Sequence, residues 1–131
     1  MIYDFQQTKY FNSQEFDSPD IKGSGYLMKA AFMQRLVKAR KIAKIPFCIN
    51  SGYRSKEYNK QLYKKMGKPV VNSAHTRGWA ADIHTQNLTD RYIILSALIE
   101  VGFTRIGIAR TFIHVDCDPS KNPSKIWIYA S

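Results

Sequence analysis

The sequence is poor in cysteine, and this limits the kinds of metal site that it can build. It has 2 cysteines, Cys48 and Cys117, and they do not form the closely spaced pairs typical of thiolate metal sites. A metal site in this chain would therefore have to use histidine and aspartate. Both cysteines fall in separate strand-like segments, so we expect buried thiols, although two adjacent cysteines could also form one disulfide.

Long apolar runs are also absent. No run approaches the ~20 apolar residues that a helix needs to cross a bilayer. The first ten residues lack a basic region followed by an apolar segment, so no secretory signal peptide is visible. We therefore expect a protein that is made in soluble form in the cytoplasm and that needs outside help to leave it.

Acidic residues are scarce relative to basic ones. The sequence has 20 lysines and arginines against 10 aspartates and glutamates, which gives a formal net charge of +10. Such a charge favours polyanionic surroundings, such as nucleic acid or anionic cell-wall polymers. No segment resembles a known nucleic-acid-binding motif, so we interpret the basic residues mainly as solvated helix faces that also aid adsorption to anionic surfaces.

Apolar residues are plentiful enough for one hydrophobic core. A chain of 131 residues that is 44% hydrophobic and 13% aromatic suits a single domain over residues 1–131. Helical periodicity, with Ser55 and Thr89 as N-caps of the last two helices, predicts helices over about 28–44, 56–66 and 90–101. Alternating patterns predict strands at 47–50, 79–84, 103–108 and 111–117, and an edge strand at 126–129. Because the strands cluster late, we expect an α+β fold with a small, mainly antiparallel sheet flanked by helices.

Side chains with metal-binding chemistry gather in residues 72–84, which read N-S-A-H-T-R-G-W-A-A-D-I-H. His75 and Asp82 supply an imidazole and a carboxylate, which are both good ligands for zinc. A third candidate, His114, interrupts a predicted buried strand. These three ligands would leave one tetrahedral position open for water, as in a catalytic zinc site. The alternative is that a histidine in an apolar strand is only a hydrogen-bonded core residue.

Three motifs follow one another along the chain. They are Ser51-Gly52-Tyr53-Arg54-Ser55, Ser73-x-His75-x-x-x-Gly78-x-Ala80-x-Asp82 and Phe112-Ile113-His114-Val115-Asp116. With these motifs, and with similarity over about 11–118, the chain resembles the zinc D-Ala-D-Ala carboxypeptidase family, whose relatives include phage endolysins and other peptidoglycan peptidases. The resemblance implies a Hedgehog/DD-peptidase-like fold and one zinc ion bound by His75, Asp82 and His114.

The resemblance also implies roles for residues beside the metal. It places Arg54 near the substrate, where a guanidinium opposes the oxyanion that develops when hydroxide attacks the scissile carbonyl. It places Ser73 beside the metal, in contact with the substrate, and we include Tyr53 among the predicted substrate-binding residues. The alternatives are that Arg54 pairs with a surface carboxylate and that Ser73 caps the turn before His75.

One residue expected from the family pattern is missing. Many relatives carry Asp or Glu three residues before the last zinc histidine, where this chain has Thr111, whose hydroxyl cannot act as the general base. Strand alternation puts Asp116 on the face of His114, and it puts His84 on the face of Asp82. We predict that Asp116 is the general base and that His84 is the alternative. Asp116 could instead orient His114.

The sequence supports three functional hypotheses. The first is a zinc peptidase that cuts the stem peptides or cross-links of peptidoglycan, as a carboxypeptidase or an endolysin-like endopeptidase. The second, which Thr111 suggests, is a zinc-binding but inactive wall-recognition module or phage structural component. The third is a nucleic-acid-binding protein, which the charge alone suggests and the absence of a binding motif opposes. Because neither a signal peptide nor a wall-binding domain is visible, we expect a phage-encoded enzyme that reaches the cell wall with help from another agent.

Overall fold

The three predicted helices are present in the computed structural model, which describes residues 2–130. They are α1 (Ala30–Ala43), α2 (Lys56–Lys65) and α3 (Leu88–Glu100). The Ser55 side chain caps α2 as predicted, because it accepts a hydrogen bond from the amide of Tyr58. Asn87, and not Thr89, caps α3, and its side chain accepts a hydrogen bond from the amide of Asp90. None of the helices within residues 2–130 has the length and apolar character that a membrane crossing requires.

The predicted strands form one sheet with the order β1-β2-β4-β3-β5. They are β1 (Ile49–Ser51), β2 (Ala80–His84), β3 (Arg105–Ile108), β4 (Phe112–Asp116) and β5 (Lys125–Ile128). The first four strands of this order pair antiparallel, whereas β5 runs parallel to β3 at the edge. Strand β4 ends at the end of the sheet where β3 begins, and residues 117–124 stay at this end, so β5 starts beside the first residue of β3 and runs in the same direction. The structure confirms the predicted α+β fold with a mainly antiparallel sheet.

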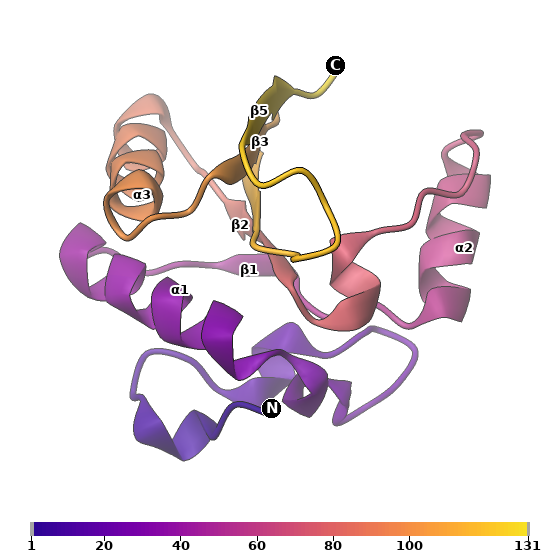
Figure 1. Ribbon diagram of the computed structural model, residues 1–131, viewed down its shortest axis with the longest axis horizontal. Coiled ribbons are helices and arrows are strands. Elements are labelled where there is room, and N and C mark those ends of the chain that lie inside the picture. The colour runs from indigo at the N-terminus through magenta and orange to yellow at the C-terminus, as the bar shows by residue number, and fades with distance from the viewer. Residues whose placement is uncertain (1, 131) are drawn as a thin grey trace.

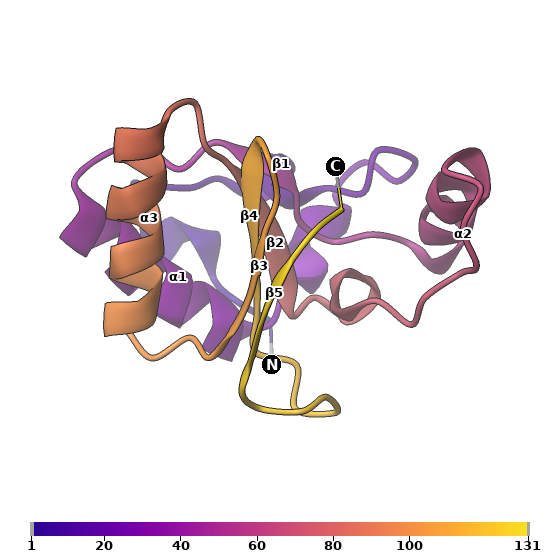
Figure 2. The same cartoon turned by 90° about the horizontal axis from the view of Figure 1, so that it is seen from above.

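The helices lie on both faces of the sheet. Helices α1 and α3 cover one face, and α2 stands off the other (Figure 2). The N-terminal residues, with three short 3-10 helices (Phe5–Gln7, Ser13–Phe16 and Ser24–Leu27), lie beyond α1 (Figure 1). Ile83 of β2 and Ile113 of β4 are fully buried in the core, together with residues of α1 and α3. Because side chains alternate along a strand, the residues next to them, Asp82 and His114, point to the α2 side.

The cysteines are less buried than predicted. Both are free thiols, but Cys48 is exposed and Cys117 is only half buried. The neighbours of Cys48, Phe47 and Ile49, pack in or against the core, so alternation places the Cys48 side chain on the opposite, exposed side of this extended segment. Its carbonyl group accepts a hydrogen bond from the amide of His84 at 2.8 Å. Burial raises the pKa of the Cys117 thiol to about 11.

An ion pair ties the loop after β4 to η4 (Ala74–Arg77), a short 3-10 helix on the α2 side. Arg77 donates hydrogen bonds to the buried carboxylate of Asp118, which also accepts one from the amide of Ser120 at 2.9 Å. Burial opposes ionisation of Asp118, but Arg77 and Ser120 outweigh it and hold the pKa of this carboxyl below its ordinary value.

We expect Asp118→Asn to lower the free energy of unfolding at neutral pH by about 1.5–3 kcal/mol, because Arg77 loses its charged acceptor. A carboxyl whose pKa is lowered in the folded state stabilises the protein above its unfolded pKa, and this contribution disappears as the pH falls through the folded pKa. The difference between the wild-type and variant proteins should therefore shrink below about pH 4. Urea unfolding near pH 7 and near pH 3 measures it, and a difference independent of pH would contradict the expectation.

Candidate metal centre

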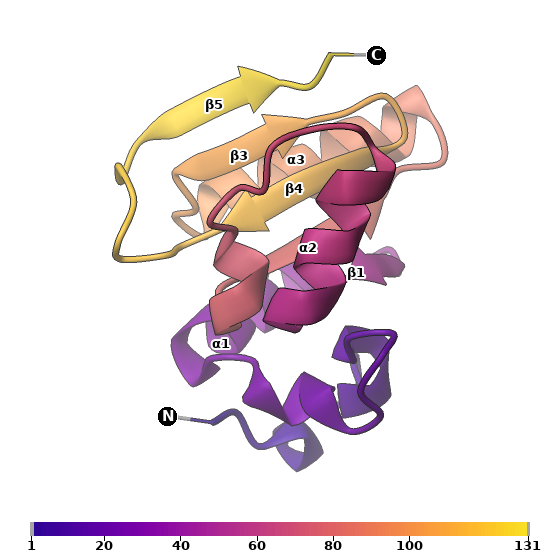
Figure 3. The same ribbon diagram turned by 90° about the vertical axis from the view of Figure 1, so that its right-hand side faces the viewer.

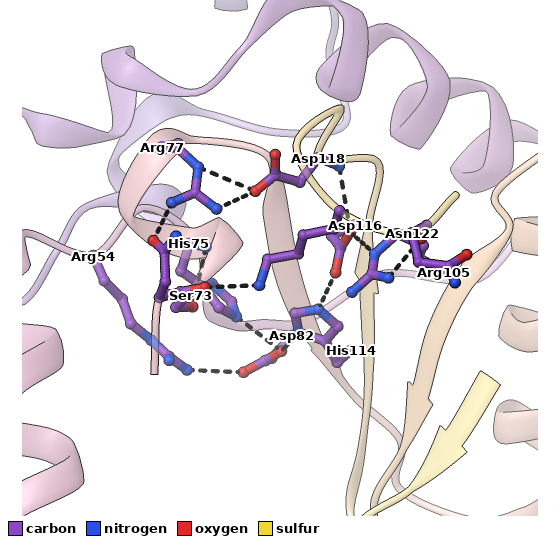
Figure 4. Close-up of polar contacts among 12 residues, drawn as sticks. Arg54, Ser73, His75, Arg77, Asp82, Arg105, His114, Asp116, Asp118 and Asn122 are labelled. Carbon is purple, nitrogen blue, oxygen red and sulfur yellow. Dashed lines mark hydrogen bonds and ion pairs between the residues drawn. The ribbon is translucent and has the colours of Figure 1, made fainter. Parts of the chain in front are cut away.

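Three elements bring the predicted metal ligands together. Helix η4 carries His75, strand β2 carries Asp82 and strand β4 carries His114. Asp82 and His114 are opposite each other in the register of β2 and β4, so their side chains lie next to each other on one face. One possible ligand atom of each of the three residues lies within 4.8 Å of those of the other two. Figure 4 shows the three side chains pointing toward one another.

The hydrogen bonds of the two imidazoles leave one nitrogen of each ring facing Asp82. His75 donates from Nδ1 to the carbonyl of Gly52 at 2.7 Å, so Nε2 carries the lone pair of the neutral ring. His114 donates from Nε2 to Oδ2 of Asp116 at 2.7 Å, which leaves its Nδ1 free. The two remaining nitrogens lie 3.2 and 2.9 Å from Oδ1 of Asp82. Two lone pairs and a carboxylate oxygen thus converge on one point, where a cation satisfies all three.

Burial and charge act against each other at these side chains, which are all buried. Burial lowers the pKa of His75 and favours its neutral form. Burial also opposes ionisation of Asp82, but the two histidines outweigh it and hold the pKa of Asp82 well below its ordinary value. For His114, the neighbouring carboxylates of Asp116 and Asp82 outweigh burial and raise the pKa of the ring. An ionised carboxylate between two imidazoles that each turn a nitrogen toward it fits a divalent cation, and the three residues could hold a metal ion.

Asp116 lies behind His114, on the far side from Asp82 (Figure 4). Its Oδ1 accepts hydrogen bonds from Nε of Arg105 at 2.6 Å and from the amide of Asp118 at 3.3 Å, and its Oδ2 accepts the one from His114. Burial raises the pKa of Asp116, but the contacts with His114 and Arg105 outweigh it and lower the pKa. Because both oxygens are engaged, the geometry favours the alternative role, in which Asp116 orients His114, over the predicted role of general base.

Arg54 and Ser73 both reach the metal centre. Arg54 donates from Nε to Oγ of Ser51 at 3.0 Å, and its Nη2 pairs with Oδ2 of Asp82 at 3.1 Å. It therefore binds a candidate ligand and not a surface carboxylate. Ser73 accepts a hydrogen bond from the amide of His75 at 3.2 Å, so it caps η4, and it also lines the cavity above the metal centre.

This cavity has a volume of about 980 Å³, and all three candidate ligands are among the residues that line it. The sheet forms one wall, and α2 with the loop that follows it forms the other (Figure 3). Among residues 2–130, the lining includes Thr111 and two side-chain carboxylates, those of Asp82 and Asp116. Six cationic side chains also line it: Arg54, Lys68, Arg91, Arg105, Arg110 and Lys121.

Two of the predicted site residues lie outside this cavity. Tyr53 is half-buried and packs against the hydrophobic core, so it is not among the lining residues with its neighbour Arg54. His84 shares a strand face with Asp82, but it lies at the end of β2 and does not line the cavity either. The structure therefore lends no support to Tyr53 as a substrate-binding residue or to His84 as the general base.

Sequence reasoning missed two residues that lie close to His114. Arg105 holds Asp116, and the ring of Trp127 lies 5.5 Å from that of His114, measured between centroids. A basic residue at the start of an apolar strand is a weak signal that could have drawn attention to Arg105. Nothing in the sequence indicates that β5 pairs with β3, so Trp127 had no comparable signal.

Comparison with known proteins agrees with this geometry. The family model described as Peptidase M15 matches residues 4–118, a range that includes His75, Asp82 and His114 and ends before β5. A search of curated proteins found no match to the chain. The match covers most of the chain, and the three candidate ligands of the motifs meet in one buried centre. The chain therefore belongs to the peptidase M15 family, the D-Ala-D-Ala carboxypeptidase-like family.

Proposed function

We propose that the protein is a zinc-dependent peptidase that hydrolyses peptide bonds of bacterial peptidoglycan, as a carboxypeptidase or an endolysin-like endopeptidase. The observation that carries the proposal is the buried centre of His75, Asp82 and His114, which lies in a cavity with room for a peptide. Membership of the peptidase family implies peptide substrates. Peptidoglycan as the substrate rests on the resemblance of the three motifs to a family whose relatives include phage endolysins.

Each residue of the centre has a role in this proposal. A zinc ion bound by the three ligands would supply a water of lowered pKa and polarise the scissile carbonyl. Arg54, with its guanidinium in the cavity, stabilises the negative charge that develops on the carbonyl oxygen. Asp116 holds the proton on Nε2 of His114, which keeps Nδ1 free to bind the metal. Ser73 holds His75 in place through the cap of η4.

The charge of the cavity fits an acidic substrate. Six cationic side chains face two carboxylates, and both carboxylates already contact histidines. Peptidoglycan stem peptides carry free carboxylates and many wall polymers are anionic, so both would be attracted to a protein with a net charge of +10. Anionic cell-wall polymers are therefore proposed as additional partners at the surface.

Mass spectrometry of purified muropeptides tests the proposal. The zinc-loaded protein should shorten or release stem peptides, a chelator should stop the reaction, and added zinc should restore it. Full zinc content without any cleavage would contradict the enzyme and favour the inactive wall-recognition module. Salt-sensitive DNA binding by a protein without zinc would favour the nucleic-acid-binding hypothesis.

The role of Asp116 is tested by Asp116→Asn. We expect the fold to be retained and zinc affinity to fall by about 10–100-fold, because the amide keeps the shape of the carboxylate but loses the charge that fixes His114. Competition with a chromophoric chelator measures the affinity, and Asp90→Asn, on α3 at the opposite face of the sheet, is the matched control. Unchanged zinc affinity together with a fall of about 100-fold or more in turnover would instead identify Asp116 as the general base.

A further inference from the structure

The strand registers align the candidate metal ligands with an aromatic residue at the edge of the sheet. Asp82 is opposite His114, His114 is opposite Gly107, and Gly107 is opposite Trp127. Residues that are directly opposite each other in neighbouring strands point to the same face. Trp127 of β5 therefore lies on the face that carries the metal centre, although β5 is outside the range matched by the family.

Gly107 allows Trp127 to reach His114. A Cβ atom at position 107 would lie 2.5 Å from Nε1 of Trp127 and 2.8 Å from Cε2 of Tyr129, which is far inside van der Waals contact. Because β3 has no side chain at this point, the indole ring lies across the strand, 5.5 Å from the His114 ring and tilted by 46° to it. The guanidinium carbon of Arg105 lies 5.3 Å from the centroid of the indole ring. The indole ring therefore contacts both the His114 ring and the Arg105 guanidinium.

Trp127 and Tyr129 form an aromatic wall of the cavity. Phe112 of β4 extends this wall, with its ring centroid 5.5 Å from that of Tyr129. Helix α2 and the loop that follows it stand in front of the sheet (Figure 3). The side of the cavity that they form is also mainly apolar. Its apolar lining residues are Leu62, Tyr63, Met66 and Val71. A peptide bound at the metal centre would therefore pass between two apolar walls.

We propose that Trp127 and Tyr129 are specificity-determining residues, which form an aromatic subsite for the part of a peptide substrate next to the scissile bond. This inference rests on the proposed peptidase function and names the residues that select its substrate. Aromatic rings bind aliphatic side chains and flat peptide groups through dispersion and the exclusion of water. The subsite therefore favours peptides with aliphatic side chains beside the bond that is cut.

Kinetics with Trp127→Ala test the subsite. The substrate is the synthetic pentapeptide L-Ala-γ-D-Glu-L-Lys-D-Ala-D-Ala, and the proteins are zinc-loaded. We expect KM to rise about tenfold, which corresponds to about 1.4 kcal/mol of binding free energy, while kcat changes less than about threefold. Trp127→Phe keeps a ring and should recover most of the lost affinity. Ile126→Ala is the matched control, because Ile126 is a neighbour in β5 that is 63% exposed and does not line the cavity.

Two results would overturn the subsite. One is an unchanged KM in Trp127→Ala. The other is a fall in kcat and zinc affinity at constant KM, which would mean that Trp127 only supports His114 and does not touch the substrate.

Tryptophan fluorescence separates this inference from the proposed function. The chain has 2 tryptophans, so Trp79→Phe leaves Trp127 as the only indole and Trp127→Phe leaves Trp79. In stopped-flow mixing with the pentapeptide, the emission of Trp79→Phe should change on binding, and that of Trp127→Phe should not. A Trp127-dependent signal without cleavage would support the subsite while the peptidase function fails. Cleavage with wild-type KM in all Trp127 variants would support the function while the subsite fails.

Discussion

In His114→Ala, we expect zinc affinity to fall by more than about 100-fold and peptidase activity to disappear. Changing a partner outside the ligand set of a metal typically costs about 10–100-fold in affinity, and loss of one of three protein ligands should exceed this. The substitution removes Nδ1, which lies 2.9 Å from Oδ1 of Asp82, and it also leaves the buried Asp116 without the proton of Nε2. Metal binding and catalysis should therefore fail together.

Metal analysis after dialysis against a weak chelator measures the effect. His84→Gln is the matched control for metal content, because His84 shares a strand face with Asp82 but does not line the cavity. It should keep wild-type zinc content, and circular dichroism should show that both variants fold. Full zinc occupancy in His114→Ala would mean that the ion binds elsewhere and that the assigned centre is wrong.

Arg54→Lys should fold normally, keep its zinc and lose about 10²–10³-fold in kcat, the typical effect of removing one donor to a developing oxyanion. The guanidinium of Arg54 contacts Ser51 through Nε and Asp82 through Nη2 at the same time. The single ammonium group of lysine keeps the charge but cannot reproduce this planar arrangement of donors. Stability and turnover should therefore respond differently to the substitution.

Thermal unfolding, zinc content and kcat for muropeptide cleavage together test this expectation. Arg40→Lys is the matched control, since Arg40 lies on α1, across the sheet from the cavity, and its guanidinium carbon stacks 4.6 Å from the ring of Tyr10. A rate near that of the wild type in Arg54→Lys would show that Arg54 only helps to orient Asp82. The charge opposing the oxyanion would then have to come from another group in the cavity.

Local patterns in the sequence were sufficient to predict most of the elements. Apolar spacing and capping residues predicted the three helices, and alternation predicted the strands to within a few residues, because all of these signals depend on neighbours along the chain. The errors fall at element ends, where one residue changes the outcome. Asn87 caps α3 in place of Thr89, and β1 begins at Ile49 and not at Phe47.

The candidate ligands were also within reach of the sequence. His75 and Asp82 lie in one short segment, and the third motif contains His114, so residue type and motif order were enough to group them. The geometry adds that β2 and β4 place Asp82 and His114 opposite each other, with His75 held against them by the carbonyl of Gly52.

The roles of the surrounding residues were decided only by the tertiary structure. Strand alternation put Asp116 on the face of His114, but it could not show that Arg105 and His114 occupy both of its oxygens. Trp127 reaches the site because β5 pairs with β3 and Gly107 leaves space between them. By itself, the sequence determined which residue types are present and which strand face each occupies, since these depend on local periodicity. Which residue lies across from another depends on strand pairings between distant segments, and these form only when the whole sheet assembles.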